Sequence, residues 1–123
     1  MPAELLVEGD AVGTVTATAP RYRGRAEGQR APEGSRFAVV QISYEATAPL
    51  SYRTADWIVV DTDGSRHSPA EVQAEGPLGD GDLEASETAT GTITFQVPSD
   101  ADVAAIVLRL EGAASDLLAF QVP

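Results

Sequence analysis

The chain contains no cysteine, which excludes disulfide bonds, thiolate metal sites, a cysteine nucleophile and a lipid-modified cysteine within this segment. It also contains no lysine, so its basic side chains are 8 arginines, set against 19 acidic residues, and the net charge is −11. A chain with this charge is repelled by nucleic acid and by anionic membrane surfaces. We therefore expect no nucleic-acid partner and no direct membrane insertion.

No apolar run approaches the roughly 18 residues that span a bilayer. Residues 1–8 have no basic start and contain only three consecutive apolar residues, so we do not expect them to act as a signal peptide. Either the protein stays in the cytoplasm or the sequence begins after a removed leader. A length of 123 residues with 43% hydrophobic content predicts one domain over residues 1–123, with residues 1–10 as a loose, acidic N-terminal extension.

The sequence lacks any segment with the period of an amphipathic helix, whereas many segments alternate apolar and polar residues as strands do. The clearest is residues 92–98, where Ile93, Phe95 and Val97 share one face and Pro98 ends the strand. We expect Phe95 in the core together with Trp57, whose indole N–H then needs a hydrogen-bond partner. The predicted strands span residues 12–19, 36–47, 54–61, 66–68, 87–97, 104–111 and 116–122.

About seven strands at regular spacing predict an all-β fold, an immunoglobulin-like antiparallel β-sandwich with Greek-key crossings and no disulfide. Val12 is out of phase with the first predicted strand, and Gly13 indicates a bulge there. Residues 69–85 are expected to form a long acidic crossing that Leu78 and Leu83 attach to the core.

Residues 21–36 are predicted to form a long loop, because they contain three glycines and a proline. Five arginines and two glutamates give this segment a charge of +3, so the rest of the chain carries −14. The loop either folds back onto the protein's own acidic surface or binds an acidic partner. In the second case the contact residues are Arg21, Arg23, Arg25 and Arg30, with Tyr22 as an anchor, since Arg and Tyr are enriched at binding hot spots.

Three stretches together resemble a known family: residues 36–44, residues 57–64, and residues 83–98 with their Phe-x-Val-Pro ending at Pro98. The family is the immunoglobulin-like extracellular domain of bacterial surface lipoproteins, of unknown function and related to the secreted immunoprotective extracellular proteins. The similarity covers roughly residues 12–122. Ala85-Ser86 stands where the family has Pro-Gly, and Ala46 stands where it has Asn. The resemblance implies an extracellular or surface-displayed domain and brings no catalytic residues.

Catalytic signatures are weak. His67 is the only histidine, and Asp61, Asp63, Ser65 and Ser68 are near it in the sequence, but a Gly-x-Ser-x-Gly elbow is missing. One histidine and one methionine are too few for a zinc or copper site. We therefore expect no enzyme and no cofactor, and hydrolase activity is the least favoured of the functions considered.

Acidic loops offer a weak calcium hypothesis. If the loops meet at one end of the sandwich, the ligands would be Asp61, Asp63, Asp80, Asp82 and Glu84. Their spacing does not fit the helical calcium loop, and a solvated acidic rim is the favoured interpretation.

Two classes of function follow from the sequence. The favoured one is a non-enzymatic binding or adhesion module outside the cell or on its surface, recognising an unknown protein or an acidic surface component. The alternative is a structural spacer of a lipoprotein or membrane-anchored protein that holds another domain off the envelope. In either case we expect a monomer or a weak dimer.

Overall fold

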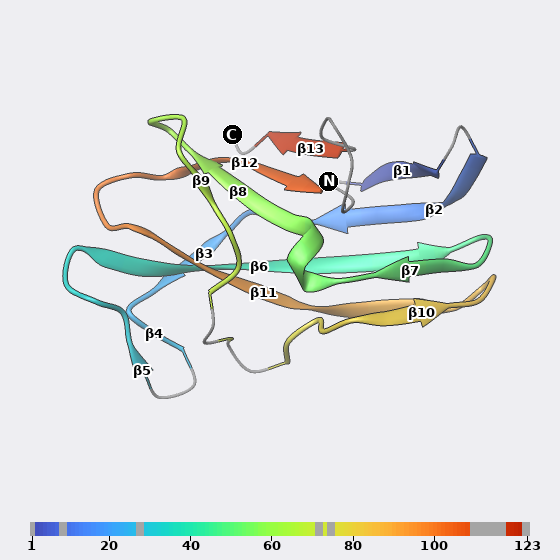
Figure 1. Cartoon of the computed structure of the whole chain (residues 1–123), viewed down its shortest axis with the longest axis horizontal. Coiled ribbons are helices and arrows are strands. Elements are labelled where there is room, and N and C mark those ends of the chain that lie inside the picture. Colours follow the sequence, from blue (N-terminus) through green and yellow to red (C-terminus); the bar gives the residue numbers. More distant parts are fainter. Residues whose placement is uncertain are drawn as a thin grey trace.

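The structure is a computed structural model that describes residues 2–7, 10–26, 29–70, 73, 76–108 and 118–121. It confirms the all-β prediction: two antiparallel sheets enclose a common hydrophobic core, and the described residues contain a single 3₁₀ turn, Thr54–Asp56, and no α-helix. Figure 1 shows the long strands of one sheet crossing the molecule below the shorter strands of the other.

The larger sheet contains the strands that pair in the order β1-β2-β6-β11, with β3 beside β6: β1 (Pro2–Val7), β2 (Asp10–Ala17), β6 (Ser35–Ala46), β11 (Thr88–Pro98) and β3 (Arg21–Arg23). The smaller sheet contains the strands that pair in the order β13-β12-β8-β9: β13 (Leu118–Gln121), β12 (Val103–Leu108), β8 (Trp57–Asp61) and β9 (Arg66–His67). Two further pairs are short: β7 (Leu50–Tyr52) with β10 (Gly81–Leu83), and β4 (Arg25–Ala26) with β5 (Gln29–Arg30). All seven predicted strands are present in the described residues, with ends shifted by a few positions.

The pair formed by β6 and β11 is the longest in the fold and contains the predicted central strand. Ile93, Phe95 and Val97 point into the core and are at most 1% exposed, whereas Gln96 between them faces solvent. Phe95 lies opposite Ala38, a small residue that leaves room for the ring. The alternation in the sequence therefore predicted the inward face of β11 correctly.

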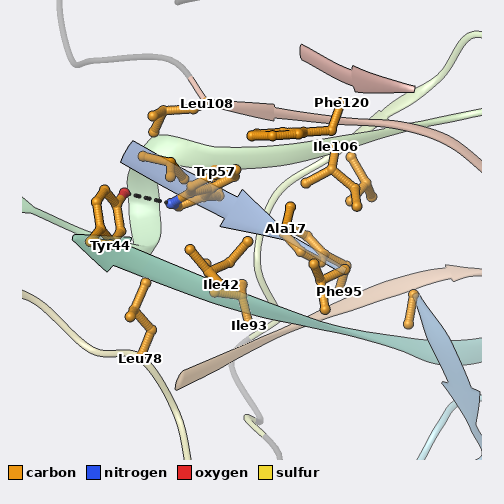
Figure 2. Packing of buried hydrophobic residues seen from close by; sticks show 14 of the residues in the cluster. Ala17, Ile42, Tyr44, Trp57, Leu78, Ile93, Phe95, Ile106, Leu108 and Phe120 are labelled. Carbon is orange, nitrogen blue, oxygen red and sulfur yellow. Dashed lines mark hydrogen bonds between the residues drawn. The ribbon is translucent and has the colours of Figure 1, made fainter. Parts of the chain in front are cut away.

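Trp57 is fully buried, as predicted, and its indole N–H has the partner that burial requires. Its Nε1 donates a hydrogen bond of 3.0 Å to the hydroxyl of Tyr44, which belongs to the opposite sheet (Figure 2). The Trp57 ring also stacks on Phe120 with centroids 6.2 Å apart, and Tyr44 stacks on Tyr52 at 5.3 Å. Burial raises the pKa of the Tyr44 hydroxyl well above its usual value, so Tyr44 stays neutral.

The N-terminal segment differs from the loose extension expected over residues 1–10. Pro2–Val7 forms β1 and pairs with β2. The register shifts between Leu5 and Leu6, so Val12 is the extra residue on β2, and the bulge predicted at Gly13 is confirmed. A Cβ on Gly13 would lie 2.4 Å from the carbonyl oxygen of Glu45, which explains why glycine is needed at this crossing of backbones.

The prediction of an irregular loop over residues 21–36 is wrong. Arg21–Arg23 pairs with β6 along the edge that β2 leaves free, and the β4–β5 hairpin follows. Gly24 lies in a bend between β3 and β4, and Gly34 lies in the turn before β6, so these glycines separate short strands rather than mark irregular structure.

The outer face of the larger sheet is covered at one end. Phe37 and Val39 point away from the main core and are buried against Ala31 and Ala70. The segment containing Ala70 also closes the outer edge of β11. Gln73 completes that closure through its side-chain amide, which accepts from the N–H of Thr94 at 2.9 Å and donates to its C=O at 3.1 Å.

The acidic crossing is attached to the core by Leu78 and Leu83, as predicted. It ends in a tight turn before β11, where Ser86 has φ 75°, and it is the only non-glycine described with positive φ. The resemblance placed a family glycine at this position. The structure therefore explains why glycine suits the position and shows that Ser86 carries backbone strain.

Replacing Phe95 by alanine removes a ring that is fully enclosed between the sheets, so we expect the free energy of unfolding to fall by about 3–5 kcal/mol. Chemical denaturation measures the loss. The exposed neighbour Gln96→Ala serves as the control and should change stability by less than about 0.5 kcal/mol. A loss of similar size in both variants would contradict the assignment of faces on β11.

Ser86→Gly should stabilise the protein by about 0.5–1 kcal/mol, because glycine adopts positive φ without the steric cost that serine has. The measurement is the denaturation midpoint. Ser86→Ala keeps the Cβ and should give no gain, so stabilisation by both substitutions would show that the backbone conformation is not the cause.

Candidate functional site

The four arginines singled out in the sequence lie on β3 and on the β4–β5 hairpin, and we call Arg21, Arg23, Arg25 and Arg30 the basic strip. All four are exposed. Within the part of the chain that the structure describes, none of them forms an ion pair with a carboxylate.

Pairing with β6 fixes the direction of the side chains on β3. Arg21 lies opposite Val39 and Arg23 opposite Phe37, so both arginines share the outer face of the larger sheet with these residues. Tyr22 lies between them and points inward. A shallow groove of about 450 Å³ adjoins the two arginines and is otherwise lined mainly by neutral polar groups and Pro20.

Tyr22 has a structural role in the fold. Its hydroxyl accepts a hydrogen bond of 2.9 Å from the backbone N–H of Val103 in the opposite sheet. The guanidinium of Arg36 lies 3.6 Å above the Tyr22 ring and pairs with Asp102 at 2.6 Å. Tyr22 therefore links β3 to the opposite sheet. This link fixes the position of the strand from which the side chains of Arg21 and Arg23 project.

The β4–β5 hairpin brings the other two arginines together. Arg25 and Arg30 are direct cross-strand partners, and a hydrogen bond of 2.8 Å from Ala31 N–H to the carbonyl of Gly24 closes the hairpin base. Like charges directly opposite each other repel and destabilise a strand pair. An anion placed between the two guanidinium groups would relieve that repulsion, and guanidinium groups suit carboxylate and phosphate geometry.

His67 and Asp61, the residues of the hydrolase hypothesis, do form a pair. His67 Nε2 lies 2.7 Å from Asp61 Oδ2, and the other carboxylate oxygen of Asp61 accepts from the backbone N–H of Asp63 and of Ser65. Among the described residues no serine hydroxyl hydrogen-bonds His67. The arrangement holds the turn at Gly64 closed, and the hydrogen bond from His67, followed by the two backbone bonds, lowers the pKa of Asp61.

The five acidic residues of the calcium hypothesis are not brought together. Asp61 and Asp63 belong to the β8–β9 turn, whereas Asp82 lies on β10 at the other end of the molecule (Figure 1). Asp80 accepts from the N–H of Thr54, and Asp82 accepts from the hydroxyl of Ser51. Across the described residues there is no cluster of three or more His, Cys, Asp or Glu side chains that could hold a metal ion.

Within the described ranges, no helix is both long and apolar enough to span a bilayer.

Comparison with known proteins identifies the fold but no sequence family. No protein-family model and no curated protein sequence matches the chain. The predicted lipoprotein ycdA of Bacillus subtilis has a similar structure, with a TM-score of 0.68 and 12% identity over 90% of this chain and 37% of its own. This chain therefore spans only about a third of the length of ycdA.

Two other solved structures match along most of their own length. The secreted protein MPT63 of Mycobacterium tuberculosis has a TM-score of 0.58 and 15% identity, covering 89% of this chain and 83% of its own. A β-sandwich protein of Clostridium difficile 630 has a TM-score of 0.51 and 12% identity, covering 89% and 85%. At these identities the comparisons show a shared fold, and that fold is the β-sandwich that the strand pattern predicted.

The lowered pKa of Asp61 makes a testable contribution to stability. Because the folded pKa lies below the unfolded value of about 3.9, the stabilisation is present above that value and is lost as the pH falls through the folded pKa. Asp61→Asn should therefore melt at a lower temperature than the wild type at pH 6, and the two melting curves should converge as the pH falls below 3. A constant difference across this range would show that the charge of Asp61 is not what matters.

Proposed function

We propose that the protein is a non-enzymatic binding module, outside the cell or on its surface, that captures an acidic protein or surface polymer through the basic strip. The observation that carries this proposal is the group of four exposed arginines, unpaired within the part of the chain that the structure describes, on a molecule whose remaining charge is −15. Arginines that have no counterion among the described residues are available to an external carboxylate or phosphate.

Rigid support for the strip favours binding over a mobile charged loop. Arg21 and Arg23 project from a strand whose middle residue, Tyr22, is held by Val103 and Arg36. The hairpin carrying the other pair is held on the sheet by Ala31, which packs on Phe37 and Val39. Pre-ordered side chains lose less conformational entropy on binding, which raises affinity for a given set of contacts.

Location outside the cell is supported by the structural neighbours. One is the secreted protein MPT63 and another is a predicted lipoprotein, so the fold occurs in proteins of that compartment. The absence of catalytic activity is supported by the hydrogen bonds of Asp61 and His67, which the turn of the β8–β9 hairpin accounts for.

A second candidate function is that of a spacer domain. It is favoured by the comparison with ycdA, in which the matched region is 37% of a longer chain. A spacer needs a stable fold and binds no ligand. Removing the arginines of the basic strip would therefore leave the function of a spacer intact, whereas it would abolish the function of a binding module.

The decisive variant changes all four arginines of the basic strip to serine. We expect its melting temperature to stay within about 2 °C of the wild type, since exposed unpaired charges contribute little to stability. Binding to polyglutamate, measured by titration at low salt, should fall at least about ten-fold, because guanidinium groups supply the charge-assisted hydrogen bonds. Duplex DNA should not be bound by either protein.

A matched variant with lysine at the same four positions keeps the charge and removes the guanidinium fork. It should retain part of the binding and show a steeper dependence on salt. The same three proteins are then compared for retention of components from the surface extract of the native organism. Equal retention by the wild type and the serine variant would reject the binding function and leave the spacer.

A further inference from the structure

A second hollow is lined in part by residues of β7 and β10. These two strands lie at the other end of the molecule from the β4–β5 hairpin (Figure 1). Its volume is about 520 Å³, which is in the range of small-molecule sites. The wall is mostly apolar and comes from five separate parts of the chain: Val12, Tyr44, Leu50, Leu83 and Leu108. None of these residues belongs to the site described above.

Among the described residues, nothing covers this part of the core. Tyr44, Leu83 and Leu108 belong to the main core cluster, so the floor of the pocket is core surface. Val12 is the bulged residue of β2 and is only partly buried, as is Leu50 at the start of β7. Apolar surface that stays accessible next to the core favours a ligand with an apolar body.

The described charged side chains that line the hollow are all acidic. Asp56 is 6% exposed, and its Oδ1 accepts from Arg53 Nη2 at 3.0 Å. The carboxylate of Asp56 makes no further hydrogen bond in the described part of the chain, so Oδ2 is available to a ligand. Asp82 and Glu84 add two carboxylates at the rim, and the described lining contains no basic side chain.

We propose that this pocket binds a small molecule with an apolar body and one positively charged nitrogen, an amphiphilic amine. The apolar body would cover Leu50, Leu83 and Leu108 and displace water from them. The ammonium group would donate to the free oxygen of Asp56, where a largely desolvated carboxylate makes a strong charge-assisted hydrogen bond. The rim carboxylates attract cations toward the opening and repel anionic amphiphiles of the same shape.

Trp57 provides a built-in reporter. It is the only tryptophan in the chain, and its indole N–H donates to the hydroxyl of Tyr44, which lines the pocket (Figure 2). A ligand that packs against Tyr44 changes the surroundings of this hydrogen bond. Binding is therefore expected to alter Trp57 emission even though Trp57 itself is fully buried.

The test compares three probes with one carbon chain: n-octylamine, n-octanol and n-octanoate, each at neutral pH and below its micelle concentration. Trp57 emission and calorimetric titration report binding to the full chain. We expect octylamine to bind at least about ten-fold more tightly than octanol, since only the amine adds a charge-assisted hydrogen bond. Octanoate should not bind.

Variants separate the charge from the shape of the pocket. Asp56→Asn keeps the size of the side chain and should reduce octylamine affinity about ten-fold while leaving octanol binding unchanged. If Asp56→Asn lowers the melting temperature strongly, the double variant Asp82→Asn with Glu84→Gln replaces it and should weaken octylamine binding by a smaller factor. Asp63→Asn, an exposed carboxylate on the distant β8–β9 turn, is the control and should have no effect.

Three results would overturn the proposal. The first is equal affinity for all three probes, and the second is no octylamine binding below the micelle concentration. The third is octylamine affinity that is the same in the wild type and in whichever pocket variant remains folded. Because the serine variant of the basic strip leaves this pocket untouched, it should bind octylamine like the wild type, so failure of one site is distinguishable from failure of the other.

Discussion

The hydrogen bond between Trp57 and Tyr44 is the constraint on which the sandwich depends, because it fixes how the two sheets face each other. Apolar contacts alone have little directional preference, whereas a buried N–H must find its acceptor in one place. Tyr44 lies on β6 and Trp57 on β8, so the bond fixes one sheet against the other at the centre of the aromatic group with Tyr52 and Phe120. A chain without disulfides thereby obtains a specific cross-sheet link from two side chains.

A second cross-sheet link lies on the other side of the core and explains why the arginines of β3 are well placed. The phenol of Tyr22 reaches the backbone of Val103, and Arg36 covers the ring while pairing with Asp102. Inward-facing Tyr22 thus determines that its two neighbours face outward, since side chains alternate along a strand. The same residue that holds the fold together therefore sets the orientation of the charged surface.

Much of the fold could be predicted from the sequence, because alternation on β6 and β11 reports directly which face is buried. The inward positions of Phe95 and Trp57, the bulge at Gly13 and the anchoring of Leu78 were all read correctly. The short strands β3, β4, β7 and β10 were missed, because two or three residues are too few to show an alternating pattern. Such short segments become strands because a neighbouring strand is there to pair with them.

The sites were less predictable than the fold. The basic strip was visible as a local charge excess, but the inward direction of Tyr22 depends on its register with Ala38 and could not be read from the residue type. The pocket at β7 and β10 was missed because it combines Val12, Asp56 and Leu108, which are distant in the sequence and meet only through the fold. Acidic residues such as Asp61 and Asp82, grouped by their type, proved to lie in separate places.

The closure of β11 by Gln73 restricts how this protein can be recognised. At Thr94 the side-chain amide occupies both the donor and the acceptor that an added strand would use, and the N–H of Ala70 shares the same carbonyl. Strand addition, the mode by which many sandwich proteins take up an extended peptide, is therefore blocked at this edge. A partner that approaches β11 here must contact side chains instead of pairing with the backbone. For the same reason, neighbouring copies cannot extend the sheet there into a fibre.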